Sequence, residues 1–357
     1  MRKWIILLLL LAAIGQADAS SLPSELTDPL PPGSALEELE EGETGVHTLT
    51  DGLADLWDQA CGHLLGMVKE SVSCAVLLLS VVVICGLAQD CLHAARGDEA
   101  PGYVPMVGAL AITWIAAGNM QSLMGQGVET MEQLNVYSKA LLPTLAAAVA
   151  AGGGVASAGV RHVAGVFFAD VLITIIRNVL LPMVYVYVAL AAADAMLPGH
   201  RLKTIAKAIS KCTAWVLTGT LVLYTGYLTI SGAVAGSTDT LTTQLTRSAM
   251  GTVPVVGNII SDAAGTVLAG AAMLKNTIGV AGMLGILAMC LVPFLRLAVQ
   301  YLLYKITAFL AGTMGASQLV DLVDGLGSAF GMVLGMTGAC ALLLLISVIS
   351  SIMVVTV

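Results

Sequence analysis

The chain has 357 residues, of which 57% are hydrophobic and 11% charged, and its mean hydropathy is +0.92. Soluble domains usually carry roughly 25% charged residues, so the composition excludes an ordinary soluble domain. Repeated continuous apolar stretches can each cross a hydrocarbon core about 30 Å thick. They lack the ten-residue alternation of a β-barrel, so the sequence predicts an all-α, polytopic helical membrane protein.

The first 19 residues have the pattern of a secretory signal peptide. Arg2 and Lys3 form a basic start, Trp4–Ile14 is a short apolar core, and Ala17–Ala19 is an A-x-A cleavage pattern. The alternative is a retained anchor helix. Cleavage would place the chain from Ser20 onward outside the cytoplasm.

Residues 20–65 form a predicted extracytoplasmic acidic arm. Between Ser20 and Ala60 the chain carries acidic residues and no Lys or Arg, and this arm accounts for the net charge of −8. Such a composition is typical of a solvated, poorly ordered segment. It argues against binding of the arm to nucleic acid or anionic lipid.

About seven membrane spans are expected, within a range of six to eight, together with short interfacial or re-entrant helices. N-terminal membrane helices occupy 66–236, an extracytoplasmic segment 237–277, and C-terminal membrane helices 278–357. The predicted crossings are Gly66–Ala88, Val104–Met124, Ser138–Ala158, Val163–Leu197, Cys212–Gly236, Ile278–Leu297 and Phe330–Val355. Gly152–Gly154 predicts a break, because successive glycines weaken a helix. The short block Val299–Met314 is expected to be interfacial or a half-span.

The orientation follows from the basic residues of short loops. Arg201, Lys203, Lys207 and Lys211 form the strongest cluster and should face the cytoplasm, as should Arg161.

The block Val163–Leu197 would then have to leave and return, which favours a hairpin or two broken helices meeting near Arg177. A single oversized, tilted helix is the alternative, and it conflicts with the charge rule.

Charged and small residues in the spans are the first candidate sites. Asp170 and Arg177 lie seven residues apart, so they would share a helix face, either as part of an ion path or as a mutually neutralising pair. Gly327, Gly331 and Gly335 form a four-residue stripe that lets another backbone approach. The stripe could pack within one subunit or between subunits, so a homo-oligomer is possible.

A further candidate is the stretch between Thr252 and Gly279. Pro254 and Gly257 break the chain before it, and Asp262 suits the positive end of a helix dipole. Lys275 and Asn276 would close this helix, where a cation is favoured. At about 20 Å it would be too short to cross. It is expected at the outer interface, where it either braces the bundle or meets partners.

Enzyme signatures are absent from the sequence. It contains no HExxH zinc motif, no GxSxG nucleophile elbow and no P-loop. No nucleophile, base and stabiliser can be assembled, so we expect no enzymatic activity, no catalytic residues, no cofactor and no metal.

The stretch VPVVGNIISDAAGTVLAGAAMLKNTIGVAG, from Val253 to Gly282, resembles the stage III sporulation protein AE family of endospore-forming bacteria. Further resemblance is found in AAGGGVASAG, in NVLLPMVYVYVAL around Pro182, and in YKITAFLAG from Tyr304. The resemblance covers nearly the whole chain and is weakest in the acidic arm.

This resemblance implies a subunit of a channel, or feeding tube, between mother cell and forespore, located in the mother-cell membrane around the forespore. It implies as partners a cytoplasmic ATPase and ring-forming proteins encoded together with it, and a forespore membrane protein. It implies a need for the protein in late forespore gene expression and spore formation. The alternatives are a stand-alone permease or secondary transporter, which Asp170 and Arg177 favour, and a passive scaffold for ring-forming partners.

Overall fold

The computed structural model describes residues 49–96, 103–197, 202–251, 257–313 and 317–353. Over 232–251 and 257–269 it describes the backbone alone. The predicted signal peptide, the arm up to residue 48 and Pro254 lie outside these ranges.

All regular structure in the described chain is helical, and no strand occurs there. The elements are α3 (Leu49–Arg96), α4 (Tyr103–Ala151), α5 (Val155–Ile175), the π-helix η3 (Ile176–Leu180), α6 (Leu181–Met196), α7 (Lys203–Gly251), α8 (Gly257–Gly312) and α9 (Ser317–Ile352).

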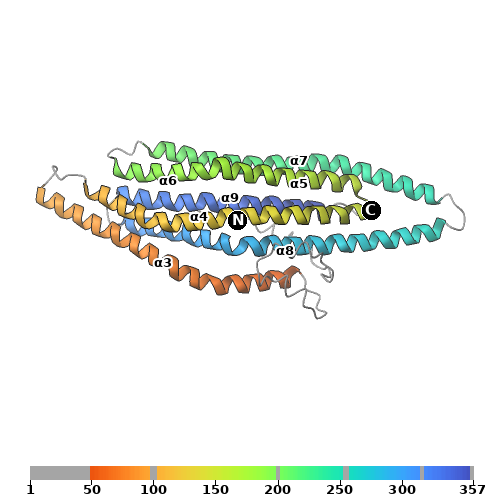
Figure 1. Ribbon diagram of the computed structural model, residues 1–357, viewed down its shortest axis with the longest axis horizontal. Helices are drawn as coiled ribbons and strands as arrows, with labels where there is room; N and C mark the ends of the chain where they lie inside the picture. Colours follow the sequence, from red (N-terminus) through yellow and green to blue (C-terminus); the bar gives the residue numbers. More distant parts are fainter. Residues whose placement is uncertain (1–48, 97–102, 198–201, 252–256, 314–316, 354–357) are drawn as a thin grey trace.

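The helices lie side by side along one axis and form an elongated bundle (Figure 1). Helices α5, α6 and α7 lie along one side and α3 along the other, with α4, α8 and α9 between them (Figure 1). Six of the described helical segments are long and apolar enough to cross a membrane. The expectation of an all-α, polytopic membrane protein is therefore confirmed.

Helices α8 and α9 form the centre of the bundle. The most apolar windows of these two helices are 61% and 67% buried, against 17% for α3. Glycines allow close packing around them, because a Cβ at Gly285 of α8 would overlap the Tyr137 hydroxyl of α4. A Cβ at Gly282 would likewise lie 2.6 Å from a Leu141 methyl. Small residues at the seams thus permit the packing that associates helices in a membrane.

The predicted crossings Val104–Met124 and Ser138–Ala158 are wrong as separate spans, because the first and most of the second, up to Ala151, lie in the single helix α4. The polar residues between them do not form a loop. Gln126 accepts a hydrogen bond from Arg296 of α8 at 2.9 Å, and Glu132 pairs with Arg177. Because neighbouring helices provide bonding partners for these polar side chains, α4 can continue as a helix through the polar stretch. Its 49 residues rise about 73 Å, more than twice the thickness of a hydrocarbon core.

The predicted hairpin in Val163–Leu197 is also wrong. Helix α5 continues through η3 into α6, so Val155–Met196 is one helical segment, as the single-helix alternative proposed. Pro182 falls in the first turn of α6, directly after the π-helix. The missing N–H of a proline matters least there, because the wider turn already alters the hydrogen bonding.

The short capped helix predicted to end at Lys275 and Asn276 is not present as such. Helix α8 begins at Gly257, contains Asp262, and runs unbroken through both residues to Gly312. Lys275 is buried, with 5% of its surface exposed, whereas Asn276 is exposed. The block Val299–Met314, expected to be interfacial, forms the end of α8 as far as the structure describes it.

The predicted break at Gly152–Gly154 is confirmed. Gly153 has a φ of 91°, a conformation that glycine adopts without a steric penalty, and it separates α4 from α5. As a result Arg161 lies at the opposite end of the bundle from Lys203. Arg161 bonds to Ser350, near the end of α9, and Lys203 to Asp321, near its start. The expectation that both basic residues face one compartment is wrong.

Candidate functional site

A group of charged side chains lies midway along the bundle, where α4 packs against the α5–η3 segment. We call Glu132, Asn135, Lys139, Asp170 and Arg177 the mid-helix cluster. On α4 the first three are three and four residues apart, which places them on one helix face. Asp170 and Arg177, seven residues apart, face them from α5 and η3.

Two ion pairs join the two sides of this cluster. The Lys139 ammonium lies 3.4 Å from an Asp170 carboxylate oxygen, and the Arg177 guanidinium 2.8 Å from Glu132. Asp170 and Arg177 do not pair with each other, so the predicted pair is replaced by two bonds to α4. Asp170 and Arg177 do share a helix face, as predicted, but the residues of α4 lie closer to each of them than they lie to one another.

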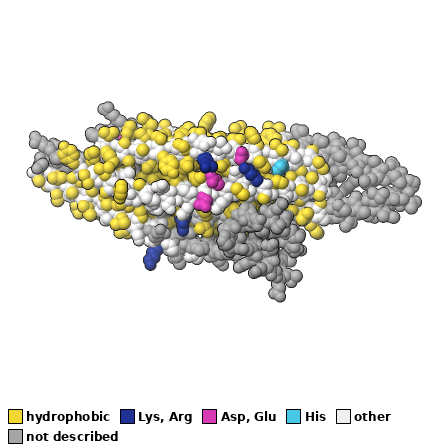
Figure 2. Space-filling view, in the orientation of Figure 1, with side chains coloured by type: hydrophobic (Ala, Val, Ile, Leu, Met, Phe, Trp, Pro, Cys, Tyr) yellow, Lys and Arg dark blue, Asp and Glu magenta, His cyan; other side chains and the backbone are white. Residues whose placement is uncertain are grey.

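The mid-helix cluster is open to its surroundings. Its four charged side chains retain between 48% and 66% of their surface exposed. Glu132, Asp170 and Arg177 border an open cavity of about 540 Å³ that is also lined by Thr174 and Asn178. Asn135 donates weakly to Asp170 at 3.5 Å, and its buried side-chain oxygen has no partner among the described atoms. Figure 2 shows charged side chains grouped midway on a largely hydrophobic face.

The π-helix contributes to the geometry of this cluster. Helix η3 begins at Ile176, directly before Arg177, and it interrupts the regular hydrogen bonding of a long apolar helix. Single π turns of this kind occur frequently at functional sites. Here the wider turn presents Arg177 and Asn178 beside α4.

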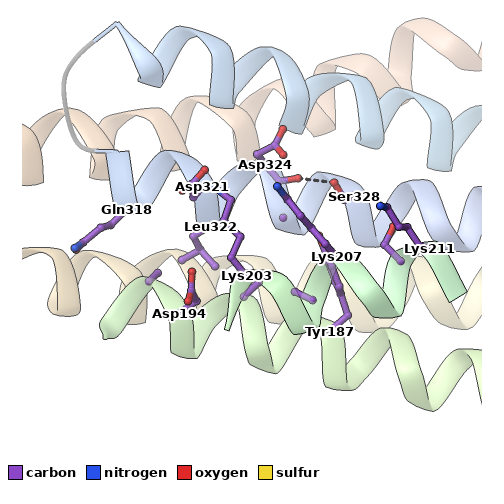
Figure 3. A pocket seen from close by; sticks show the side chains of 15 residues that line it. Tyr187, Asp194, Lys203, Lys207, Lys211, Gln318, Asp321, Leu322, Asp324 and Ser328 are labelled. Carbon is purple, nitrogen blue, oxygen red and sulfur yellow. Dashed lines mark hydrogen bonds and ion pairs between the residues drawn. The ribbon is translucent and has the colours of Figure 1, made fainter. Parts of the chain in front are cut away.

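A second polar site lies where α6, α7 and α9 meet (Figure 3). It is a cavity of about 270 Å³, which we call the end cavity. Its polar lining consists of Tyr187, Asp194, Lys203, Lys207, Ser210, Lys211, Gln318, Asp321, Asp324 and Ser328.

Each carboxylate of the end cavity has a partner. The buried Asp194 accepts a hydrogen bond from the Leu202 N–H at 2.9 Å, and Asp321 pairs with Lys203 at 2.7 Å. Asp324 pairs with Lys305 of α8 at 2.7 Å. Lys305 also donates to Ser328 at 2.9 Å, so it ties α8 to α9. Lys207 and Lys211 make no ion pair within the described chain.

The glycine stripe of α9 divides between two neighbours. A Cβ at Gly327 would lie 3.1 Å from the Tyr304 Cβ of α8, and one at Gly331 would lie 3.0 Å from the Tyr301 ring. These two glycines therefore permit close packing within one subunit. Gly335 is exposed, and Leu217 of α7 is its nearest neighbour at 3.8 Å.

Sequence reasoning missed the α4 half of the mid-helix cluster and the acidic residues of the end cavity. The signal was present, because Glu132, Asn135 and Lys139 have helical spacing, but Glu132 and Asn135 fall between two predicted crossings while Lys139 falls inside the second. In the described ranges no three His, Cys, Asp or Glu side chains gather in a way that could hold a metal ion.

Comparison with known proteins decides the family. The model of the family "Stage III sporulation protein AE" matches residues 34–356, a range that contains every described helix. The chain belongs to this family. It is 19% identical over 358 residues to the stage III sporulation protein AE of Bacillus subtilis (strain 168), with 90% of each chain covered. No solved structure matches the chain.

Membership connects the fold with sporulation. The resemblance carried by Val253–Gly282, and by the segments around Pro182 and Tyr304, is thereby confirmed. The protein is a helical membrane protein of a sporulation family, and its mid-helix cluster and end cavity are its candidate functional sites.

Proposed function

We propose that this protein is a non-enzymatic, multispanning subunit of the channel complex that connects mother cell and forespore. It acts in the mother-cell membrane around the forespore and supports late forespore gene expression. Its partners are the ATPase and the ring-forming proteins encoded with it and a forespore membrane protein. Membership of a sporulation family supports this role.

The mid-helix cluster is the observation that carries the proposal. A charged residue at the centre of a membrane helix costs roughly 2.5–3.5 kcal/mol on insertion scales. Four half-exposed charges therefore favour an environment of water or protein over lipid. In the channel complex this face borders the aqueous path, and its paired charges of both signs keep the wall near neutral.

The helix directions support one orientation. With the N-terminus outside after signal cleavage, α3 and α4 cross twice and place Gly152–Gly154 outside. The continuous α5–η3–α6 segment then brings Lys203, Lys207 and Lys211 to the cytoplasmic end, as basic residues of short loops prefer. The α7–α8 end, including Asp262, faces the space between the two membranes.

Complementation of a null strain tests the proposed function. A null strain should stop after engulfment, and the wild-type gene should restore late forespore reporter expression. The variant Glu132→Gln/Arg177→Gln removes one ion pair of the mid-helix cluster without leaving a lone charge. Its reporter expression should fall at least tenfold at unchanged protein abundance.

The control is Lys69→Gln, which removes a charged side chain that is exposed on α3, outside both candidate sites. It should retain reporter expression. Normal sporulation of the null strain would contradict the channel role. Wild-type expression from the Glu132→Gln/Arg177→Gln variant would contradict the role of the cluster and favour a passive scaffold.

A stand-alone transporter is the second candidate, and the mid-helix cluster also favours it. Transport by the protein alone in vesicles, lost in the Glu132→Gln/Arg177→Gln variant, would support that alternative.

Cysteine labelling tests the orientation. A cysteine replacing Asp262 should react with an impermeant thiol reagent from outside, and one replacing Lys203 only after permeabilisation.

A further inference from the structure

Two lysine side chains that line the end cavity make no ion pair within the described chain. With Lys305 counted, four lysines and three aspartates surround it. Lys203 and Lys305 pair with Asp321 and Asp324, and Asp194 accepts the Leu202 N–H. Lys207 and Lys211 therefore remain as the uncommitted charges.

The two lysines are placed to act on one ligand. They are four residues apart on α7 and thus lie on the same face of that helix. Both side chains point from α7 toward α9 and line the cavity (Figure 3). Ser210, Ser328 and Tyr187 add hydroxyl groups to the same wall. Two ammonium groups among hydroxyls favour an anion that accepts several hydrogen bonds, such as a phosphate group.

The position of the cavity along the bundle indicates where that phosphate comes from. Trp215 lies one helical turn beyond Lys211 on α7, and 79% of its surface is exposed. Tryptophans concentrate at the level of the lipid headgroups, because the ring is apolar and its N–H is polar. Beyond it, Val222 and Leu223 of α7 expose 64% and 69% of their surface, as expected along lipid tails.

We propose that the end cavity binds the headgroup phosphate of an anionic membrane lipid through Lys207 and Lys211. Its volume of about 270 Å³ leaves room for a phosphodiester and its glycerol carbons. A choline headgroup would add a cation beside two lysines and is disfavoured. Binding here does not involve the acidic arm, and it stands independently of the proposed channel role.

Native mass spectrometry of the purified full chain in a neutral detergent tests this site. The probes are phosphatidylglycerol, phosphatidylcholine with the same acyl chains, and inorganic phosphate. The wild type should prefer phosphatidylglycerol. One basic residue near an anionic lipid surface changes the binding affinity by about 5-fold. Lys207→Gln and Lys211→Gln should therefore each weaken phosphatidylglycerol binding by about 5-fold. The double variant should weaken it by about 30-fold.

Two further variants distinguish lipid binding at the end cavity from non-specific electrostatic attraction between lysines and an anionic lipid. Lys207→Arg/Lys211→Arg keeps both charges and should retain the preference for phosphatidylglycerol. Lys69→Gln removes an exposed lysine of α3 and should leave binding unchanged. The proposal is overturned if the double Gln variant binds phosphatidylglycerol as the wild type does. It is equally overturned if Lys69→Gln loses as much affinity, or if inorganic phosphate competes fully at millimolar concentration. The single variants decide the matter if the double Gln variant does not fold.

Discussion

Replacing Gly285 with alanine tests the close packing of α4 against α8. The added Cβ would overlap the Tyr137 hydroxyl and lie 2.7 Å from the ring carbon Cζ. Ordinary carbon contacts are about 3.5–4.0 Å, so the ring or the helix must move by about 1 Å. Tyr137 is 1% exposed and has little room to move. Overpacking of this kind costs about 1–3 kcal/mol.

Gly226→Ala is the matched control for this change. Gly226 lies in the interior of α7, and a Cβ there would meet no atom within 4 Å. Both substitutions gain about 1 kcal/mol of helix propensity, so their difference in the free energy of unfolding isolates the clash. We expect Gly285→Ala to be less stable than Gly226→Ala by about 1–3 kcal/mol.

The assay is unfolding of the purified protein by sodium dodecyl sulfate, followed by circular dichroism. Adding Tyr137→Phe removes the overlapping oxygen and should restore part of the stability lost in Gly285→Ala. Equal unfolding midpoints for Gly285→Ala and Gly226→Ala would refute the packing of Tyr137 against Gly285.

Three other predictions test the seams of the bundle. In a chain without its native cysteines, Gly327→Cys/Tyr304→Cys should form an intrachain disulfide, since the Cβ separation of 3.1 Å needs to widen by only about 0.4 Å to reach the usual range of about 3.5–4.5 Å. Gly335→Cys/Tyr304→Cys should not form one, and gel mobility with and without reductant distinguishes the two variants. Lys305→Gln should lower the free energy of unfolding by about 1–3 kcal/mol, because Asp324 and Ser328 both lose a charged donor, and an unchanged midpoint would contradict this. Lys203→Gln, at a pair about 40% exposed, should cost at most about 1 kcal/mol, so a larger loss than for Lys305→Gln would reverse the expected order.

Local residue patterns were sufficient for the class of fold and the main break. Composition alone predicted a helical membrane protein, because the apolar stretches are continuous and long enough to cross. The three glycines at 152–154 predicted the end of α4, because glycine's conformational cost acts locally. The four-residue spacing of Gly327 and Gly331 predicted a packing face, although it left the partner undecided.

The candidate sites depended on contacts between distant residues. Asp170 and Arg177 share a helix face in sequence, but each has a nearer partner on α4. The end cavity unites Asp194, Lys203 and Asp321, which come from three helices. A single sequence shows which residues can share one helix face, whereas the choice of partner is made by neighbouring helices.

The sequence by itself determined that this protein is a polytopic helical membrane protein with a strongly basic stretch from Arg201 to Lys211. Tertiary structure decided where helices continue. Polar residues within α4 and η3 remain helical because Gln126 accepts a hydrogen bond from Arg296, and Glu132 pairs with Arg177, across the bundle. A short stretch of sequence cannot show these pairings, because the two partners are 45 residues apart in one pair and 170 residues apart in the other.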